Sequence, residues 1–133
     1  MARPASAHPT ELELQILKIL WEDAPLTARE IRAVLSRQNR DLAHTSVITT
    51  LQKMVEKRQV TQLDPVEGKA FRFSPRLREE DVSKRMLSDL VNRVFDGSAE
   101  AVMLKLFDVG DLNPDAVKRL RRALNDKAKE NKS

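Results

Sequence analysis

Apolar residues recur at helical spacing in three consecutive segments of the N-terminal half. The first, ELELQILKILWE (11–22), follows Thr10 and ends before Asp23-Ala24-Pro25. The second, LTAREIRAVLSRQ (26–38), opens with Thr27 and Glu30, a capping box that satisfies free N–H groups at a helix start. A polar connection, residues 39–44, leads into the third, within AHTSVITTLQKMVEKRQV (43–60). The pattern predicts three amphipathic helices.

The third segment has two chemically different faces. At helical pitch, Val47, Leu51, Met54 and Val55 gather on one side, which predicts packing against the first two helices. The opposite side carries short hydroxyls and lysines, namely Ser46, Thr49, Thr50, Lys53 and Lys57.

After Arg58 the period changes to alternation. VTQL (60–63) and AFRF (70–73) resemble short strands, and DPVEGK between them supplies a hairpin tip with Pro65 and Gly68. Alternation places Phe71 and Phe73 on one face and Arg72 on the other. Ser74-Pro75 is expected to close the unit.

From residue 76 onward the pattern is helical again. One stripe ends at Asp96-Gly97, a second follows Ser98, and a third begins at Asn113-Pro114-Asp115. In this last start the cap, the proline and the acid all favour a helix. Chains of roughly fifty residues usually need extra burial, and a second copy is the simplest partner. We expect dimerisation through Val82, Met86, Leu90, Val94, Val102, Leu106, Leu120 and Leu124.

The predicted fold class is therefore mainly α with a small β-hairpin wing. Residues 10–75 are expected to form a winged helix-turn-helix domain, and residues 76–127 a three-helix dimerisation domain. Residues 1–9 are expected to be a disordered start and residues 128–133 a frayed tail.

Composition excludes several classes of function. The 133 residues contain no cysteine, and His8 and His44 alone cannot form a structural zinc site, so no metal or cofactor is expected. No nucleophile motif or glycine-rich phosphate loop occurs, which argues against an enzyme. No apolar run could span a membrane and no secretory signal is present, so we expect a cytoplasmic protein without membrane insertion.

The net charge of +4 permits a polyanionic partner without requiring one. Residues 1–75 and residues 76–133 each carry a net charge of +2. A nucleic-acid interface must therefore be argued from the positions of the charges.

The order helix, helix, helix, hairpin suggests what the polar side of the third helix does. A helix that enters a DNA major groove needs short or hydrogen-bonding side chains near its N-terminal end. Candidate contacts to double-stranded DNA are His44, Thr45, Ser46, Thr49, Thr50, Lys53 and Lys57, with Lys69 and Arg72 on the wing. A solvated face, or a winged helix that binds protein and not DNA, would show the same stripe. Steep salt dependence would distinguish DNA binding from a protein interface.

These segments also resemble the penicillinase-repressor family, the BlaI/MecI/CopY type of bacterial transcription regulators. ELELQILKILWEDAPLTAREI is similar to the opening of that family, HTSVITTLQKMVEKR to its recognition helix, and EGKAFRFSP to its wing. RVFDGSAEAVMLKLF and LNPDAVKRLRRAL continue the likeness, which covers about residues 10–127.

The resemblance implies a homodimeric repressor that joins through its C-terminal helices. It also implies a two-fold symmetric operator with TACA/TGTA-like half-sites. By position, Thr45, Ser46, Thr49 and Lys53 would belong to the recognition helix, and Lys69 and Arg72 to the wing.

The chain departs from the family pattern at sites that matter for recognition and release. His44 stands where Tyr is frequent, and Ile48 where Lys or Arg is common. The resemblance implies release through an upstream sensor or protease system, but Lys105-Leu106 replaces the Asn-Phe cleavage pair. Copper sensing through thiolates is excluded because the tail has no cysteine.

Overall fold

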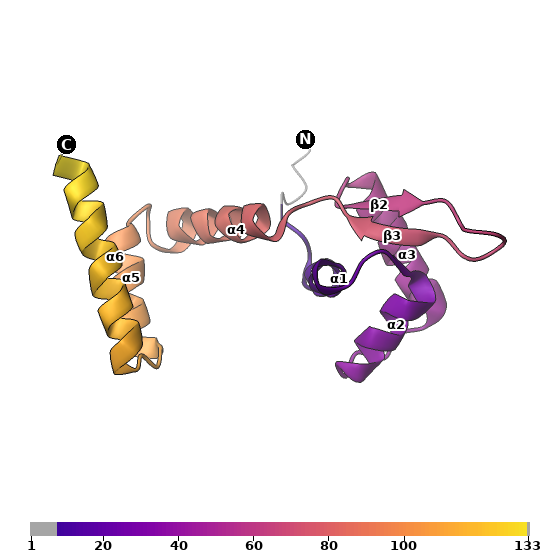
Figure 1. The fold of residues 1–133 in the computed structure, drawn as a ribbon, viewed down its shortest axis with the longest axis horizontal. Helices are drawn as coiled ribbons and strands as arrows, with labels where there is room; N and C mark the ends of the chain where they lie inside the picture. Colours follow the sequence, from indigo (N-terminus) through magenta and orange to yellow (C-terminus); the bar gives the residue numbers. More distant parts are fainter. Residues whose placement is uncertain (1–7, 133) are drawn as a thin grey trace. The chain divides into compact units, whose positions relative to one another are not determined.

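The computed structural model describes residues 8–132, so the first seven residues of the expected disordered start lie outside it. The chain forms two compact units, an N-terminal unit (Met1–Leu87) and a C-terminal unit (Ser88–Ser133). In chain order the elements are α1 (Glu11–Glu22), β1 (Leu26–Thr27), α2 (Ala28–Arg37), α3 (His44–Glu56), β2 (Val60–Leu63), β3 (Arg72–Pro75), α4 (Glu79–Val94), α5 (Ala99–Val109) and α6 (Pro114–Lys132) (Figure 1).

This architecture confirms the predicted fold class. Three helices and a small three-stranded antiparallel sheet make up most of the N-terminal unit, and the elements that follow are helices (Figure 1). The predicted helix starts are also found, since Thr27 and Glu30 form a capping box and Asn113 Oδ1 accepts from the Ala116 N–H at 2.8 Å.

The sheet differs from its prediction in two ways. The second hairpin strand is Arg72–Pro75, and not residues 70–73, because residues 64–71 form a longer connection in which Glu67 and Gly68 both have positive φ. A two-residue strand, β1, also pairs with β3, so the sheet is antiparallel with the order β1-β3-β2. Because β3 is central, its register with both neighbours fixes the base of the hairpin.

The end of the chain and the unit boundary also differ from expectation. α6 continues to Lys132, through the segment expected to be a frayed tail. The boundary between the units falls inside α4 and not at residue 76. The reason is local packing: Leu77 contacts the N-terminal core, and its carbonyl accepts a hydrogen bond from Trp21 Nε1 at 2.9 Å. The start of α4 therefore belongs to the N-terminal unit.

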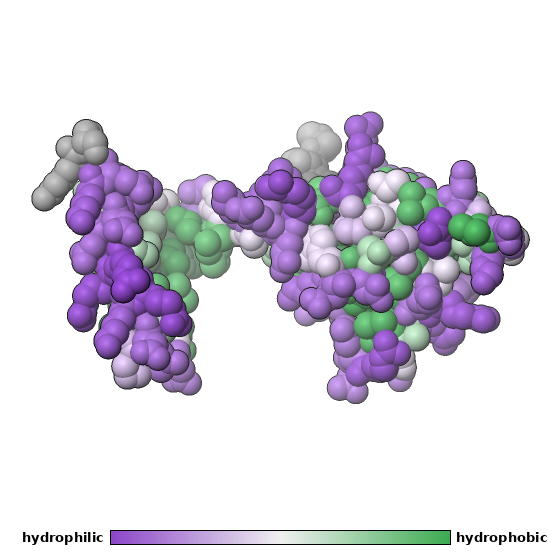
Figure 2. Space-filling model, viewed as in Figure 1, coloured by the Kyte–Doolittle hydropathy of each residue, from purple (hydrophilic) through white to green (hydrophobic). Residues whose placement is uncertain are grey.

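The two units bury their apolar residues to very different extents. In the described part of the C-terminal unit, Val102 is the one hydrophobic side chain that is buried. Figure 2 shows hydrophobic surface, in green, left open on this unit. The N-terminal unit instead closes a core of thirteen residues from α1, β1, α2, α3, β2 and β3.

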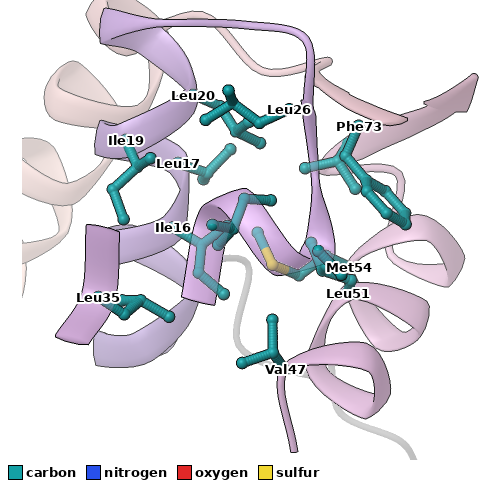
Figure 3. Packing of buried hydrophobic residues seen from close by; sticks show 13 residues of the cluster. Ile16, Leu17, Ile19, Leu20, Leu26, Leu35, Val47, Leu51, Met54 and Phe73 are labelled. Atoms are coloured by element: carbon teal, nitrogen blue, oxygen red, sulfur yellow. The ribbon is translucent and has the colours of Figure 1, made fainter. Parts of the chain in front are cut away.

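Three side chains of α3 lie at the centre of that core. Val47, Leu51 and Met54 are each 0% exposed, and Figure 3 shows them packed with residues from α1, α2 and β3. Full burial of a side chain of this size contributes about 1.5–3 kcal/mol to stability. Their spacing of four and three residues places them on one stripe of the helix, which holds α3 in a single rotational setting.

A buried carboxylate joins α1 to the end of α3. Glu13 is 3% exposed and forms a capping box with Thr10, whose backbone N–H donates to Oε1 at 2.9 Å. Lys57 Nζ donates to Oε2 at 2.8 Å, and Gln59 Nε2 donates to Oε1 at 3.3 Å. Burial raises the pKa of Glu13, but the hydrogen bonds from Lys57, Thr10 and Gln59 and the charge of Lys57 outweigh it, so the pKa lies below its ordinary value.

This lowered pKa predicts an acid-dependent contribution to stability. A carboxyl group whose folded pKa is depressed stabilises the fold above its unfolded pKa of about 4.3, and this contribution is lost as the pH falls through the folded value. We expect Glu13→Gln to lower the free energy of unfolding by about 1–3 kcal/mol near neutral pH, with the deficit narrowing in acid. Urea denaturation from about pH 7 to about pH 3 measures this.

The matched control is Glu22→Gln, at the exposed end of the same helix. It is expected to change the unfolding free energy by less than about 0.5 kcal/mol. A constant difference between the parent and Glu13→Gln at all pH values would contradict the assignment.

Candidate nucleic-acid interface

Four of the predicted contact residues lie on one exposed side of α3. They are Thr45, Ser46, Thr49 and Lys53, and together they are called the exposed face of α3. His44, the first residue of α3, is exposed at its N-terminal end. The buried stripe lies on the other side of the same helix. This surface therefore presents three hydroxyl groups close to the helix start, with a lysine one turn further on.

The start of α3 is electrostatically suited to an anion. Its first turn contains no acidic residue, and its N-cap, Ala43, provides no side-chain hydrogen bond to the free backbone N–H groups. Such a helix start carries a partial positive charge from the aligned peptide dipoles. Phosphate groups bind readily at such a position.

Polar contacts hold the connection that leads into α3. Arg32 Nε donates to the Leu42 carbonyl at 2.7 Å, and Ser36 Oγ donates to Asp41 at 2.6 Å. Arg40 Nε donates to Gln15 Oε1 on α1 at 2.9 Å. The turn between α2 and α3 is thus tied to both preceding helices, which positions the exposed face of α3.

Two predicted contact residues of α3 have partners inside the chain. Thr50 Oγ1 donates to the Ser46 carbonyl one turn earlier, at 2.9 Å. Lys57 was expected on the DNA side, but its Nζ forms the ion pair with Glu13 at 2.8 Å. Its position at the C-cap of α3 explains the difference, because the side chain there can reach the N-terminal end of α1. We therefore assign Lys57 to folding.

The wing residues also differ from each other. Lys69 lies exposed in the connection between β2 and β3. Arg72 is half-buried at the start of β3, and its Nη2 donates to the Asp64 carbonyl at 3.5 Å, the limit for a hydrogen bond. Lys69 is the better placed of the two cations for contact with a partner.

The structure adds residues that the sequence pattern missed. Gln52 is exposed on α3, and with Arg29 of α2 it lines a groove between α2, α3 and the wing. Gln52 falls between Ile48 and Thr45 on a helical wheel, next to the predicted contact residues, which could have identified it. Arg29 could not be found in this way, because its position near α3 depends on how the helices pack. Glu56 is also exposed, at the C-terminal end of α3.

The predicted dimerisation residues divide into three groups. Val82 and Val102 are each 7% exposed within the single chain, so their role as contacts between copies is corrected to internal packing. Met86 is half-buried. The remaining side chains are exposed, namely Leu90, Val94, Leu106, Leu120 and Leu124.

Three helices on a small antiparallel sheet, with a hairpin wing beside an exposed third helix, define the winged helix-turn-helix class. The particular family follows from sequence comparison. The profile of the Penicillinase repressor family matches residues 9–126, and the chain belongs to this family. Its members are transcriptional repressors and not enzymes. Within residues 8–132, no helix is both long and apolar enough to cross a membrane.

Several characterised proteins are similar over most of their length. The transcriptional regulator BlaI of Mycobacterium tuberculosis (strain H37Rv) is 34% identical over 86% of this chain and 80% of its own. The penicillinase repressor of Bacillus licheniformis is 20% identical over 88% of this chain and 89% of its own. The methicillin resistance regulatory protein MecI of Staphylococcus aureus (strain N315) is 22% identical over 86% of this chain and 91% of its own.

The two lysines of α3 should behave in opposite ways when the fold is tested. Lys57→Ala leaves the buried Glu13 carboxylate without its cation, so we expect a loss of about 1–3 kcal/mol in the free energy of unfolding. Lys53→Ala removes only an exposed side chain and should change the free energy of unfolding by less than about 0.5 kcal/mol. Chemical denaturation of the two variants at neutral pH measures both values. Equal stability of the two would show that the Glu13–Lys57 pair is dispensable.

Proposed function

We propose that the protein is a dimeric, sequence-specific DNA-binding repressor of a bacterial operon. Its operator would be two-fold symmetric, with TACA/TGTA-like half-sites. The observation that carries this proposal is the exposed face of α3, which has short hydroxyl side chains at the end of a helix fixed by a buried stripe. Such a helix end can approach base edges closely in the major groove. Family membership supports the same function.

The symmetric operator requires two copies, and the C-terminal unit supports a dimer. Between Leu90 and Leu124 large apolar side chains remain exposed, from 38% at Val117 to 71% at Val109. Water-exposed apolar surface of this extent is unusual for a monomer. α5 and α6 also border an apolar groove of about 270 Å³, lined in part by Phe107, Val117 and Leu120. A second copy of the same unit would bury these residues.

The cellular location follows from this proposal. A DNA-binding repressor acts where the chromosome is, so we assign the protein to the cytoplasm. Lys105 and Leu106 lie inside α5, and a sensor-linked protease that cut there would require this helix to open locally.

Selection of bound duplexes from a random pool tests the DNA-binding proposal. We expect an inverted repeat with TACA/TGTA-like half-sites, bound with an affinity that falls steeply with salt. Lys53→Ala should weaken binding. If Lys53 contacts a phosphate, the variant should also reduce the salt slope, which is the fall of the logarithm of the binding constant with the logarithm of the salt concentration, by about 0.9. If no sequence is enriched even at low salt, the winged helix is a protein-interaction module and the repressor proposal fails.

A charge placed on the apolar face of α6 tests the dimer. Leu124 is exposed, so Leu124→Glu should leave the single chain folded, but it would bury an unpaired charge between two copies. We expect a shift from dimer to monomer in analytical ultracentrifugation at micromolar concentration. Arg122→Glu, on the same helix but outside the Val117, Leu120 and Leu124 stripe, is the control and should remain dimeric. A parent protein that is monomeric would contradict the proposal directly.

A further inference from the structure

An open groove of about 590 Å³ lies beside the exposed face of α3. One wall is the start of α2, including Ala28 and Arg29. The second wall is the side of α3 that carries His44, Ile48 and Gln52, and the third is the wing. All three walls belong to the N-terminal unit.

The groove combines an apolar lining with positive charge. Ile48, Phe71 and Phe73 supply apolar surface, and Phe71 is 45% exposed although it is aromatic. Arg29 and Lys69 supply two positive charges, and no aspartate or glutamate is among the lining residues. A ligand that fits must therefore offer both negative charge and an apolar surface.

Two helix starts meet at this groove. Thr27 is the N-cap of α2, Arg29 lies in its first turn, and His44 is the first residue of α3. The start of α2 is occupied by its capping box and carries Glu30, whereas the first turn of α3 has no acidic residue and directs the positive end of its dipole toward the groove. The partial charge of α3 adds to those of Arg29 and Lys69.

Arg29 has no competing partner in the part of the chain that the structure describes. Among residues 8–132, its side chain forms no hydrogen bond or ion pair, and it is exposed. The neighbouring cation of α2, Arg32, is by contrast held by the Leu42 carbonyl. The Arg29 guanidinium can therefore pair with an oxyanion in a bidentate manner without first breaking an internal contact.

We propose that this groove holds the sugar–phosphate backbone of one DNA strand, with Arg29 paired to a phosphate and Phe71 packed against a deoxyribose. The inference rests on the proposed function and extends it to residues outside the exposed face of α3. In duplex DNA a sugar–phosphate backbone separates the major groove from the neighbouring minor groove. If α3 enters the major groove and the wing follows the adjacent minor groove, that backbone must pass between them. The deoxyribose matches the apolar lining and the phosphate matches the cations.

The test compares the full-length parent with Arg29→Ala and Phe71→Ala on the selected operator at several salt concentrations. Arg29→Ala should weaken binding roughly ten-fold and reduce the salt slope by about 0.9, because one phosphate contact is lost. Phe71→Ala should weaken binding roughly three- to ten-fold with the parent slope, because an apolar contact releases no counterion. Phe71→Leu should restore most of the affinity.

Arg37→Ala is the matched control, because Arg37 is an exposed arginine at the other end of α2 and borders a different groove. It should keep the parent affinity and slope. A second readout uses operators in which single phosphates are replaced by neutral methylphosphonates. Replacement at one phosphate position should weaken operator binding by the parent but not by Arg29→Ala. That position identifies the phosphate paired with Arg29.

The outcomes separate this inference from the function on which it rests. If the parent binds no DNA, the proposed function fails, and this inference with it. If the parent binds its operator but Arg29→Ala keeps the parent slope, the groove assignment is overturned while the repressor function stands. A folded Phe71→Ala variant with parent affinity would overturn the sugar contact.

Discussion

The rotational setting of α3 is the constraint on which the rest of the N-terminal unit depends. Val47, Leu51 and Met54 are fully buried, so the helix cannot turn without exposing one of them to water. A shift of one residue would rotate the helix by about 100° and replace Thr45, Ser46 and Thr49 with other side chains. The core therefore fixes not only the stability of this unit but also which atoms face a partner.

Polar contacts add positional precision to this apolar constraint. Glu13 connects the start of α1 with Lys57 at the end of α3 and with Gln59 before β2. The Gln59 carbonyl in turn accepts a hydrogen bond from the Arg76 N–H at 2.9 Å, just before α4. One buried carboxylate thus links the first helix, the base of the wing and the segment that leads into α4. Burial of the carboxylate alone would cost free energy, and its three donors offset that cost.

Sequence reasoning succeeded where the signal is local. Helix stripes, the Thr27–Glu30 box and the Asn113 cap all involve residues within about one or two turns of each other. It failed where a partner is distant in the chain. Lys57 lies 44 residues from Glu13, and β1 exists only because Leu26 and Thr27 meet β3. Helical periodicity cannot show such pairings. It likewise did not separate Val82, which packs inside its own chain, from Leu90, which stays exposed.

Ile48 shows how packing and recognition interact in this chain. The family resemblance implies Lys or Arg at this position, so Ile48 removes a cation that the resemblance would place on α3. Here Ile48 is half-buried, packs against the core and lines the groove next to Phe71 and Phe73. A charged side chain would place an ionic group against this apolar surface, and Arg29 brings positive charge to the same groove from a neighbouring helix. Phosphate contacts of this kind set the position of a protein on DNA but carry no sequence information. If the proposed function holds, the substitution at Ile48 should therefore alter the strength and register of binding more than the choice of bases, which we propose is made by the hydroxyl groups at the start of α3.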